Sequence, residues 1–500
     1  MIIKIAMLIV FFGVMVGVGL YCRKHSTDVN GFVLGGRNVG PWLTAFAYGT
    51  SYFSAVIFIG YAGQFGWKFG LASTWIGIGN AILGSMLAWL ALGKRTRIMT
   101  QHLKSKTMPE FFGVRFDSNM LKVVASIIVF IFLIPYTASL YNGLSRLFGM
   151  AFNLDYTVCI VVMAVLTGVY VIAGGYMATA INDFIQGIIM IVGIIAVIAA
   201  VLNANGGLGE AVETLSQVSD EGAGIAAGEL TAIFGPDAFS LFGVVVLTSL
   251  GTWGLPQMVQ KFYAIKDEAA IKKGTIISTV FALIVAGGCY FLGGFGRLYD
   301  IDVATVGYDA IVPAMLEKLS PLLIAVVVIL VLSASMSTLS SLVLASSSTL
   351  TLDLIKGNIV KKMDEKKQVL IMRVFIVVFI AVSAIIATVQ YKSNVTFIAQ
   401  LMGVSWGALA GAFLAPFIYS LYWKGVTKTA VIVNFIFGSG IMLANMLVKP
   451  MFPAVLQSPI NCGAFAMLAG LVIVPVVSIL TPKLKKEKTK EVFSCYDKAA

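Results

Sequence analysis

Thirteen stretches of mostly apolar residues run along this chain, and they constrain its fold more than any other feature. A bilayer core about 30 Å thick is crossed by a helix of about 20 apolar residues, which is close to the length of each stretch. Hydrophobic residues make up 59% of the chain and charged residues only 12%, too few charges to cover the surface of a soluble protein. We therefore predict an all-α polytopic membrane protein. The stretches lie at 5–22, 42–63, 69–93, 122–145, 156–173, 182–203, 239–260, 274–295, 320–348, 369–389, 395–421, 429–448 and 462–481.

The basic residues indicate an orientation in the membrane, because Lys and Arg concentrate in cytoplasmic loops. If the N-terminus is outside, most of the 35 Lys and Arg residues fall in inside segments, whereas the outside loop 204–237 has six acidic residues and no Lys or Arg. We expect a cell-membrane protein with its N-terminus outside and its C-terminus in the cytoplasm. Contact with anionic lipid then explains the net charge of +12, and no nucleic-acid partner is expected. The inside segments are 23–40, 94–122, 261–273, 356–373, 424–428 and 483–498.

The second and the seventh stretch contain residues that favour unwinding. Gly49 lies in the second stretch, and Gly251, Gly254 and Pro256 lie in the seventh. Glycine tolerates non-helical dihedral angles and proline removes a backbone donor, so we predict that both spans unwind at mid-membrane. A matched pair of interrupted spans favours two inverted five-span repeats around a transporter binding site, although such residues also serve as kinks and packing points in ordinary membrane helices.

This pairing predicts how the chain is divided. We expect an extra N-terminal span and loop at 1–40, a first repeat at 41–205, an acidic extracellular loop at 206–237, a second repeat at 238–423, two C-terminal spans at 424–482 and a basic cytoplasmic tail at 483–500.

The ninth stretch is unusually rich in hydroxyl groups, because ten of the seventeen residues from 333 to 349 are Ser or Thr. Ala334, Ser337, Thr338 and Ser341 follow helical spacing and share one face, which Ser340 flanks. Two interpretations remain open. Small residues allow helices to approach closely, and oxygen atoms are the ligands that a hard cation such as sodium prefers.

Asp183 is the acidic residue that lies at the edge of an apolar stretch. A carboxylate at the centre of a membrane helix costs about 2.5–3.5 kcal/mol on insertion scales, so its position needs a reason. It could cap the sixth span at its cytoplasmic edge, or it could neutralise a bound cation. The sequence leaves both roles open.

Four segments of the chain resemble the sodium:solute symporter family, which includes proline, pantothenate, glucose, sialic acid and monocarboxylate carriers. They are Gly35–Pro41, Gly174–Gly175 with Asp183 and Gln186, Gly254–Gln257, and Ala334–Ser341. The resemblance implies a leucine-transporter-like 5+5 inverted repeat. It also implies sodium-coupled symport of a small organic solute, such as an amino acid or a carboxylate, into the cell by alternating access.

The resemblance also implies particular residues as sodium ligands. A first ion would lie between the unwound second span and the ninth span, and some members of the family bind a second one. The first site would use the backbone carbonyls of Thr50, Phe53 and Ala334 and the hydroxyls of Ser337 and Thr338, and the second would use Asp183, Ser337, Ser340 and Ser341.

The solute pocket, by position in the family, would be lined by Tyr52, Tyr136, Thr252, Trp253 and Gln257. The segment Ile134–Ser139 resembles the proline carriers, but those carriers have Asp where this chain has Tyr52 and an aromatic residue where it has Thr252. Proline is therefore not singled out as the solute. The same aromatic side chains are also typical of simple helix packing.

Other functions on a similar scaffold remain alternatives. The chain could be another inverted-repeat carrier, coupled to protons or resembling amino-acid permeases, or a channel or sensor that does not transport. An enzyme is not expected, because the sequence has no His/Cys cluster, no Gly-rich phosphate loop and no paired intramembrane carboxylates.

Overall fold

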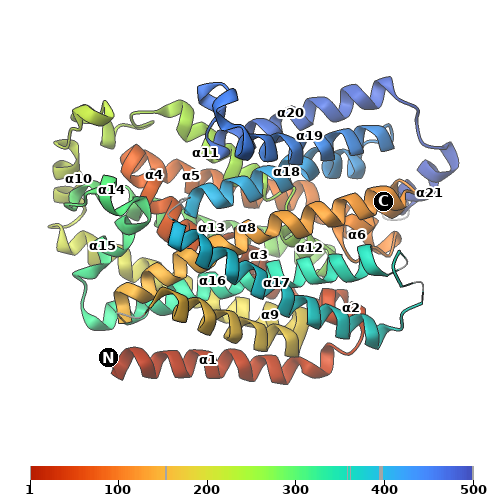
Figure 1. Ribbon diagram of the computed structural model, residues 1–500, viewed down its shortest axis with the longest axis horizontal. Coiled ribbons are helices and arrows are strands. Elements are labelled where there is room, and N and C mark those ends of the chain that lie inside the picture. The colour runs from red at the N-terminus through yellow and green to blue at the C-terminus, as the bar shows by residue number, and fades with distance from the viewer. Residues whose placement is uncertain (1, 153–154, 357, 361, 394–397, 498–500) are drawn as a thin grey trace.

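The computed structural model describes residues 2–152, 155–356, 358–360, 362–393 and 398–497. Within these ranges the chain is helical, and none of the described residues forms a β-strand. The long helices run roughly parallel to one another in one bundle (Figure 1). They are α1 (Ile2–Cys22), α3 (Pro41–Tyr52), α8 (Asn119–Phe152), α9 (Tyr156–Ala204), α11 (Ala238–Gly251), α12 (Pro256–Ala264), α13 (Glu268–Gly293), α16 (Pro321–Thr349), α17 (Glu365–Ser393), α18 (Ile398–Tyr422), α19 (Lys428–Leu447) and α20 (Pro459–Leu480).

Shorter elements connect these helices. A continuous helical run from Val56 to His102 contains η3 (Val56–Tyr61), α4 (Ala62–Phe69), η4 (Gly70–Ser73), α5 (Thr74–Gly79), η5 (Asn80–Leu87), η6 (Trp89–Gly93) and α6 (Lys94–His102). Other short helices are α2 (Val29–Leu34), α7 (Met108–Arg115), α10 (Leu208–Ser216), α14 (Val303–Val306), α15 (Ile311–Glu317) and α21 (Lys486–Asp497).

The thirteen apolar stretches lie largely on these helices, although the second and the seventh are each interrupted by a break. Residues 395–397 of the eleventh are outside the described residues. In the described part of the chain, ten helices are long and apolar enough to cross a membrane, and the bent pair α11 and α12 makes an eleventh. The number is below thirteen because two segments each hold more than one stretch. The run Val56–His102 contains the end of the second stretch and the whole of the third. Helix α9 holds the fifth and sixth, and it turns at Gly175, where a φ of 56° and a ψ of −148° favour glycine.

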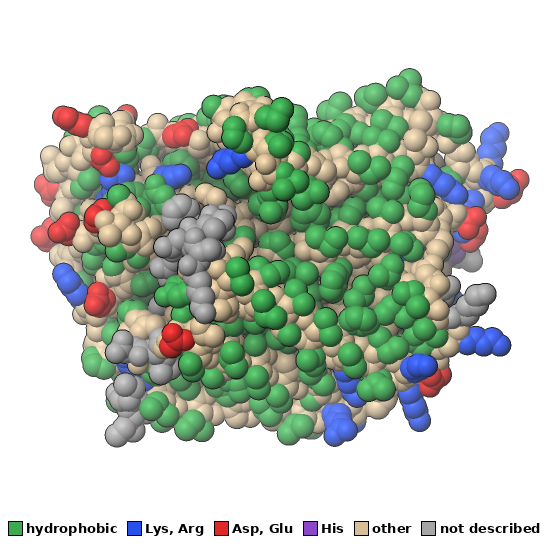
Figure 2. Space-filling view, in the orientation of Figure 1, with side chains coloured by type: hydrophobic (Ala, Val, Ile, Leu, Met, Phe, Trp, Pro, Cys, Tyr) green, Lys and Arg blue, Asp and Glu red, His purple; other side chains and the backbone are tan. Residues whose placement is uncertain are grey.

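Burial separates a central helix from those at the periphery. In α18, 94% of the most apolar window is buried inside the protein, against 22% in α1. On the face shown in Figure 2, apolar side chains cover the middle, and charged side chains gather towards the two ends. An apolar belt between two charged ends is what a lipid bilayer requires, so the chain is a multi-pass membrane protein.

The two charged ends carry different elements. Helices α10, α14 and α15 lie at one end of the bundle, together with acidic side chains, while α6 and α21 lie at the other end with many of the basic ones (Figures 1 and 2). The basic tail predicted at 483–500 contains a helix rather than only extended chain, although residues 498–500 are outside the described part. Helix α21 buries Val492, Phe493 and Cys495.

Both predicted interruptions of the helices are confirmed. Helix α3 ends at Tyr52, and Phe53 has an extended conformation, with φ −98° and ψ 121°. Helix α11 ends at Gly251 and α12 begins at Pro256, with a bend of 40° between the two halves. Helix α12 packs against α3, so the two breaks belong to neighbouring helices in the interior.

Candidate functional site

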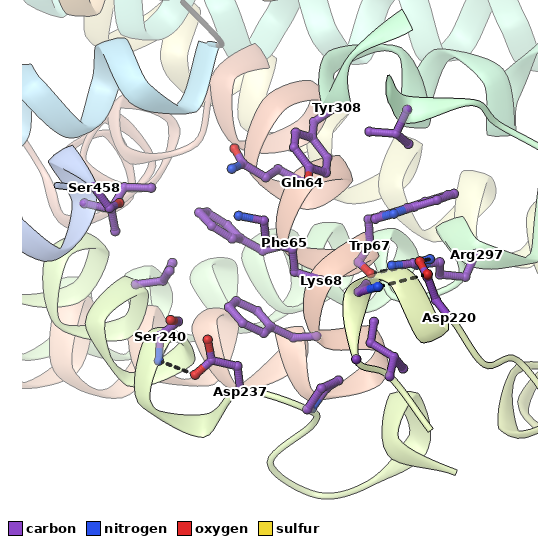
Figure 3. Close-up of a pocket in the computed structure, with 18 of the residues that line it drawn as sticks. Gln64, Phe65, Trp67, Lys68, Asp220, Asp237, Ser240, Arg297, Tyr308 and Ser458 are labelled. Atoms are coloured by element: carbon purple, nitrogen blue, oxygen red, sulfur yellow. Dashed lines mark hydrogen bonds and ion pairs between the residues drawn. The ribbon is translucent and has the colours of Figure 1, made fainter. Parts of the chain in front are cut away.

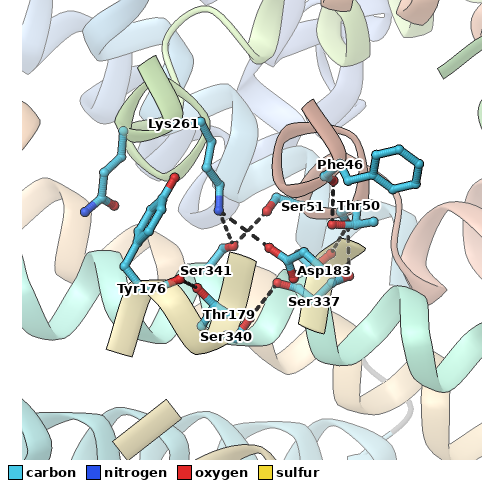
Figure 4. Close-up of polar contacts among 12 residues, drawn as sticks. Phe46, Thr50, Ser51, Tyr176, Thr179, Asp183, Lys261, Ser337, Ser340 and Ser341 are labelled. Carbon is cyan, nitrogen blue, oxygen red and sulfur yellow. Dashed lines mark hydrogen bonds and ion pairs between the residues drawn. The ribbon is translucent and has the colours of Figure 1, made fainter. Parts of the chain in front are cut away.

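The broken end of α3 meets the hydroxyl-rich face of α16, and five oxygen atoms converge there. The Ser337 hydroxyl lies 3.1 Å from the carbonyl oxygen of Thr50 and 3.1 Å from that of Ala334. The Thr338 hydroxyl lies 3.2 Å from the Thr50 carbonyl oxygen, 3.1 Å from that of Ala334 and 3.5 Å from that of Phe53. The five groups that the family resemblance implies for a first sodium ion are therefore brought together. Figure 4 shows two of these residues, Ser337 and Thr50, side by side.

Local structure accounts for this convergence. Because α3 stops at Tyr52, the Phe53 N–H still donates to the Gly49 carbonyl, but the Thr50 carbonyl has no helical partner further along the chain and is free to accept from a neighbour. On α16, Ser337 and Thr338 are adjacent residues that both approach the Ala334 carbonyl, one turn back along the helix. All of these side chains are buried, so their polar atoms depend on one another rather than on water.

The residues named for a second sodium ion lie next to the first group, on α9 and α16. Ser340 donates a hydrogen bond to the Ser337 carbonyl oxygen at 2.8 Å, and the Ser341 hydroxyl lies 2.7 Å from that of Ser51 on α3. Asp183 is fully buried, and neither of its carboxylate oxygens accepts a hydrogen bond from the described residues.

Asp183 does not cap a helix. It lies within α9, beyond the turn at Gly175, and α9 continues through it to Ala204. A capping carboxylate would accept from a backbone N–H near the start of a helix, and Asp183 makes no such bond in the part of the chain that the structure describes. The capping alternative is therefore wrong.

Lys261 is a site residue that sequence reasoning missed. The sequence places it in an inside loop at 261–273, but α12 extends to Ala264, and the Lys261 side chain is only 3% exposed. Its ammonium nitrogen lies 3.0 Å from the Ser341 hydroxyl oxygen and 3.9 Å from a carboxylate oxygen of Asp183 (Figure 4). The signal was the helix start at Pro256, because a helix from there carries Lys261 one turn beyond Gln257.

Tyr52 and Tyr136, predicted to line the solute pocket, lie on either side of a third aromatic residue, Trp406 on α18. The Tyr52 ring stacks on Trp406 with centroids 5.8 Å apart, and the Tyr136 ring meets it edge-on at 5.9 Å. The Tyr52 hydroxyl donates to the Thr248 carbonyl at 2.6 Å. Among the described residues, the Tyr136 hydroxyl and the Trp406 indole N–H make no hydrogen bond of normal distance and angle, although the Tyr136 hydroxyl lies near Ser54 and Trp406. Trp406 is the second residue that sequence reasoning missed, since it lies in an ordinary apolar stretch.

The other three predicted pocket residues lie at the break between α11 and α12. The Thr252 hydroxyl lies 2.9 Å from the Gly84 carbonyl oxygen, and the Trp253 indole donates to the Leu83 carbonyl at 2.9 Å. Both side chains therefore link the break between α11 and α12 to η5 by hydrogen bonds. Gln257 is buried, and neither atom of its amide group has a partner in the described chain. Its amide is thus available to a ligand, whereas the polar atoms of Thr252 and Trp253 are already used.

A cavity of about 740 Å³ opens at the end of the bundle that carries the acidic loop (Figure 3). The Arg297 guanidinium forms an ion pair with Asp220 at 2.7 Å beside it, and it also donates to the Trp67 carbonyl at 3.0 Å. The hydrogen bond from Arg297 holds the pKa of Asp220 below its ordinary value. Other residues that line the cavity are Gln64, Phe65, Lys68, Asp237, Ser240 and Tyr308.

The chain is similar to known proteins along nearly its whole length. The family model described as the sodium:solute symporter family matches residues 32–438. Sodium/proline symporters of Staphylococcus aureus strains JH9 and NCTC 8325 are 29% identical over 497 residues, which covers 96% of this chain and 92% of theirs. A solved structure of a Na⁺-coupled sialic acid symporter, in a substrate-bound outward-open state, matches with a TM-score of 0.76 and 16% identity, over 97% of this chain and 99% of that one. This last likeness shows a shared leucine-transporter-like fold.

Proposed function

The chain belongs to the sodium:solute symporter family, and we propose that its co-transported sodium ion binds between the broken end of α3 and α16. As a member of this family, the protein couples the movement of a small solute across the membrane to that of sodium. The proposed ligands are the backbone carbonyls of Thr50, Phe53 and Ala334 and the hydroxyls of Ser337 and Thr338.

One observation carries this proposal. The Thr338 hydroxyl has a single proton to donate, yet it lies within 3.1–3.5 Å of three carbonyl oxygens. Ser337 adds one more proton beside two of the same carbonyls. The cluster therefore has more lone pairs than protons, in a buried place where unsatisfied oxygens are costly. A monovalent cation would satisfy them together, with each hydroxyl turning a lone pair towards the ion.

The position of the ion explains how it could couple to transport. Three proposed ligands come from α16 and two from the end of α3, so the ion stabilises arrangements in which these two helices are close. Helix α12 packs against α3, and the solute residues at the break before α12 therefore respond to the same arrangement. Coupling of this kind is reciprocal, since sodium raises the affinity for solute by the same factor as solute raises the affinity for sodium.

We further propose that transport runs into the cell. The end of the bundle with α6 and α21 carries many of the basic side chains, which favours the cytoplasmic side, and the end with the acidic loop then faces outward. The cavity beside Arg297 would be the outer entrance. Each sodium ion that enters moves down a membrane potential worth about 2.3 kcal/mol per 100 mV.

The solute would bind between the aromatic residues and the break before α12. The Trp406 indole offers a donor, and the Tyr136 hydroxyl and the Gln257 amide each offer a group that both donates and accepts. The rings of Tyr52 and Trp406 offer an apolar wall. This set fits a small solute that is partly apolar and carries few polar groups. The similar proteins from Staphylococcus aureus are sodium/proline symporters, which makes proline the first solute to test.

A thermal-unfolding screen of the purified protein tests this function. Proline, other amino acids and small monocarboxylates are added one at a time, in sodium chloride and again in potassium chloride. We expect one solute class to raise the unfolding temperature in sodium and not in potassium, and the same solute to accumulate in proteoliposomes under a sodium gradient. Stabilisation that is equal in both salts, or uptake driven by a proton gradient alone, would contradict sodium coupling.

A further inference from the structure

Lys261 contacts Asp183 and Ser341, two of the four residues that the family resemblance associates with a second sodium ion. We propose that the ammonium group of Lys261 serves there as a tethered cation, so that this protein binds one sodium ion per cycle rather than two. The inference deepens the proposed function, because the single sodium ion is the one assigned above to Ser337 and Thr338.

The geometry of the contacts supports this role. The Lys261 nitrogen lies 3.0 Å from the Ser341 hydroxyl oxygen and 3.9 Å from an oxygen of Asp183, and the Ser341 hydroxyl continues to that of Ser51 at 2.7 Å (Figure 4). The nitrogen also lies 5.3 Å from the centre of the Tyr176 ring, within the range of a cation–π contact. A positive charge at this point thus accompanies one hydrogen bond to a hydroxyl and faces a carboxylate and an aromatic ring, all of which favour a cation.

Electrostatics favour one cation here over two. The side chains of Asp183 and Lys261 are 0% and 3% exposed, and neither charge is stable in such surroundings unless the other balances it. With both present, the pair is neutral. A sodium ion bound to Asp183 would add a second positive charge a few ångströms from the ammonium group, and among the described residues no further acidic side chain pairs with Lys261 to balance it.

The tether also joins elements that are far apart in the sequence. Lys261 projects from α12, the second half of the broken seventh span, whereas Asp183 belongs to α9 and Ser341 to α16. A free sodium ion leaves when the site opens, but the lysine stays on α12 and moves with it. The positive charge at Asp183 would therefore be retained throughout the cycle, and solute accumulation would draw on the sodium gradient once per turnover.

Direct counting of bound ²²Na⁺ on the full-length purified protein tests the inference without knowledge of the solute. We expect one sodium ion per chain in the parent protein. Lys261→Met keeps much of the side-chain volume but removes the charge, so Asp183 should recruit an ion and the count should rise to two, with steeper sodium dependence. Lys266→Met, at an exposed lysine near the start of α13, is the matched control and should leave the count at one.

Two further variants make the result decisive. Asp183→Asn should keep one bound sodium, because Asp183 is paired with lysine and not with the ion, and the double variant Asp183→Asn/Lys261→Met should also bind one. A count of two in the parent, a loss of sodium in Asp183→Asn, or a count of one in folded Lys261→Met would each overturn the proposal. A count of two in the parent overturns the proposal even if Lys261→Met fails to fold.

Thr338→Ala separates this inference from the proposed sodium site. In the Lys261→Met background it should remove one of the two ions and leave the ion at Asp183. If both ions remain, the proposed site at Thr338 is wrong, while the gain caused by Lys261→Met still supports the tethered cation.

Discussion

The hydroxyl oxygen of Thr338 lies 3.2 Å from the carbonyl oxygen of Thr50, a residue 288 positions earlier in the chain. This contact joins the broken end of α3 to the middle of α16. It exists because α3 stops at Tyr52 and leaves carbonyl groups without helical partners. A buried hydroxyl that lies within reach of several such carbonyls favours a bound cation at this point.

Removal of one hydroxyl from the proposed sodium site should weaken sodium binding. For Thr338→Ala, and separately for Ser337→Ala, we expect the apparent sodium affinity to fall about 10-fold, which corresponds to about 1.4 kcal/mol. The measurement is the sodium concentration that gives half of the full thermal stabilisation. Ser335→Ala is the control, because Ser335 is buried on the same helix but bonds to the Val331 carbonyl. Equal sodium affinity in all three variants and the parent would show that the ion binds elsewhere.

The helical fold and the two helix breaks could be predicted because they depend on local sequence. Apolar stretches of about 20 residues define spans, and Gly and Pro mark where a helix can stop. Gly175 shows the limit of this reasoning. The sequence marks the Gly174–Gly175 pair only as part of a family motif, yet Gly175 has a positive φ that turns α9 between the fifth and sixth stretches. The angle of such a turn depends on the packing of neighbouring helices.

Lys261 and Trp406 show which part of the candidate site could not be predicted. Lys261 follows an apolar span closely, so it resembled the lysines of a cytoplasmic loop, and only its contacts with Asp183 and Ser341 distinguish it. Trp406 lies in a continuous apolar stretch, where an aromatic residue is normally packing. Its place between Tyr52 and Tyr136 depends on α18 crossing the bundle, which no local pattern specifies.

A close helix crossing makes Gly66 sensitive to substitution. A Cβ atom on Gly66 of α4 would lie 2.0 Å from backbone atoms of Gly293 at the end of α13, and backbone atoms cannot move aside cheaply. We expect Gly66→Ala to reduce the free energy of unfolding by about 1–3 kcal/mol or more, seen as a lower unfolding temperature. Gly17→Ala on α1 is the control, since nothing lies within 4 Å of its Cβ position. Equal unfolding temperatures for the two variants would contradict this crossing.

The ion pair between Asp220 and Arg297 predicts a dependence on pH at the outer cavity. The hydrogen bond from Arg297 lowers the pKa of Asp220, so the pair stabilises the folded state above the ordinary aspartate value of about 3.9 and loses this effect as the pH falls through the lowered pKa. We expect Asp220→Asn to unfold at a lower temperature than the parent at pH 7, and the difference to shrink progressively below about pH 3.9. Glu221→Gln, at an exposed neighbour, serves as the control. A difference that is constant from pH 7 to pH 3 would count against the pair.

The C-terminal helix α21 should detach when its aromatic anchor is removed. Phe493 is 5% exposed, and its ring lies 4.9 Å from the guanidinium carbon of Arg115 at the end of α7. Truncation of a buried Phe to Ala costs about 3 kcal/mol of packing free energy. A loss of this size raises the population of protein with α21 detached roughly 100-fold. We therefore expect Phe493→Ala to speed protease cleavage within Lys486–Asp497 by up to that factor, while the unfolding temperature of the membrane bundle stays close to that of the parent. Ser494→Ala, at the next and less buried position, should leave the cleavage rate unchanged.

Equal cleavage rates for Phe493→Ala and the parent would mean that α21 is held by other contacts, such as the hydrogen bond from the Tyr496 hydroxyl to the Arg95 carbonyl at 3.2 Å.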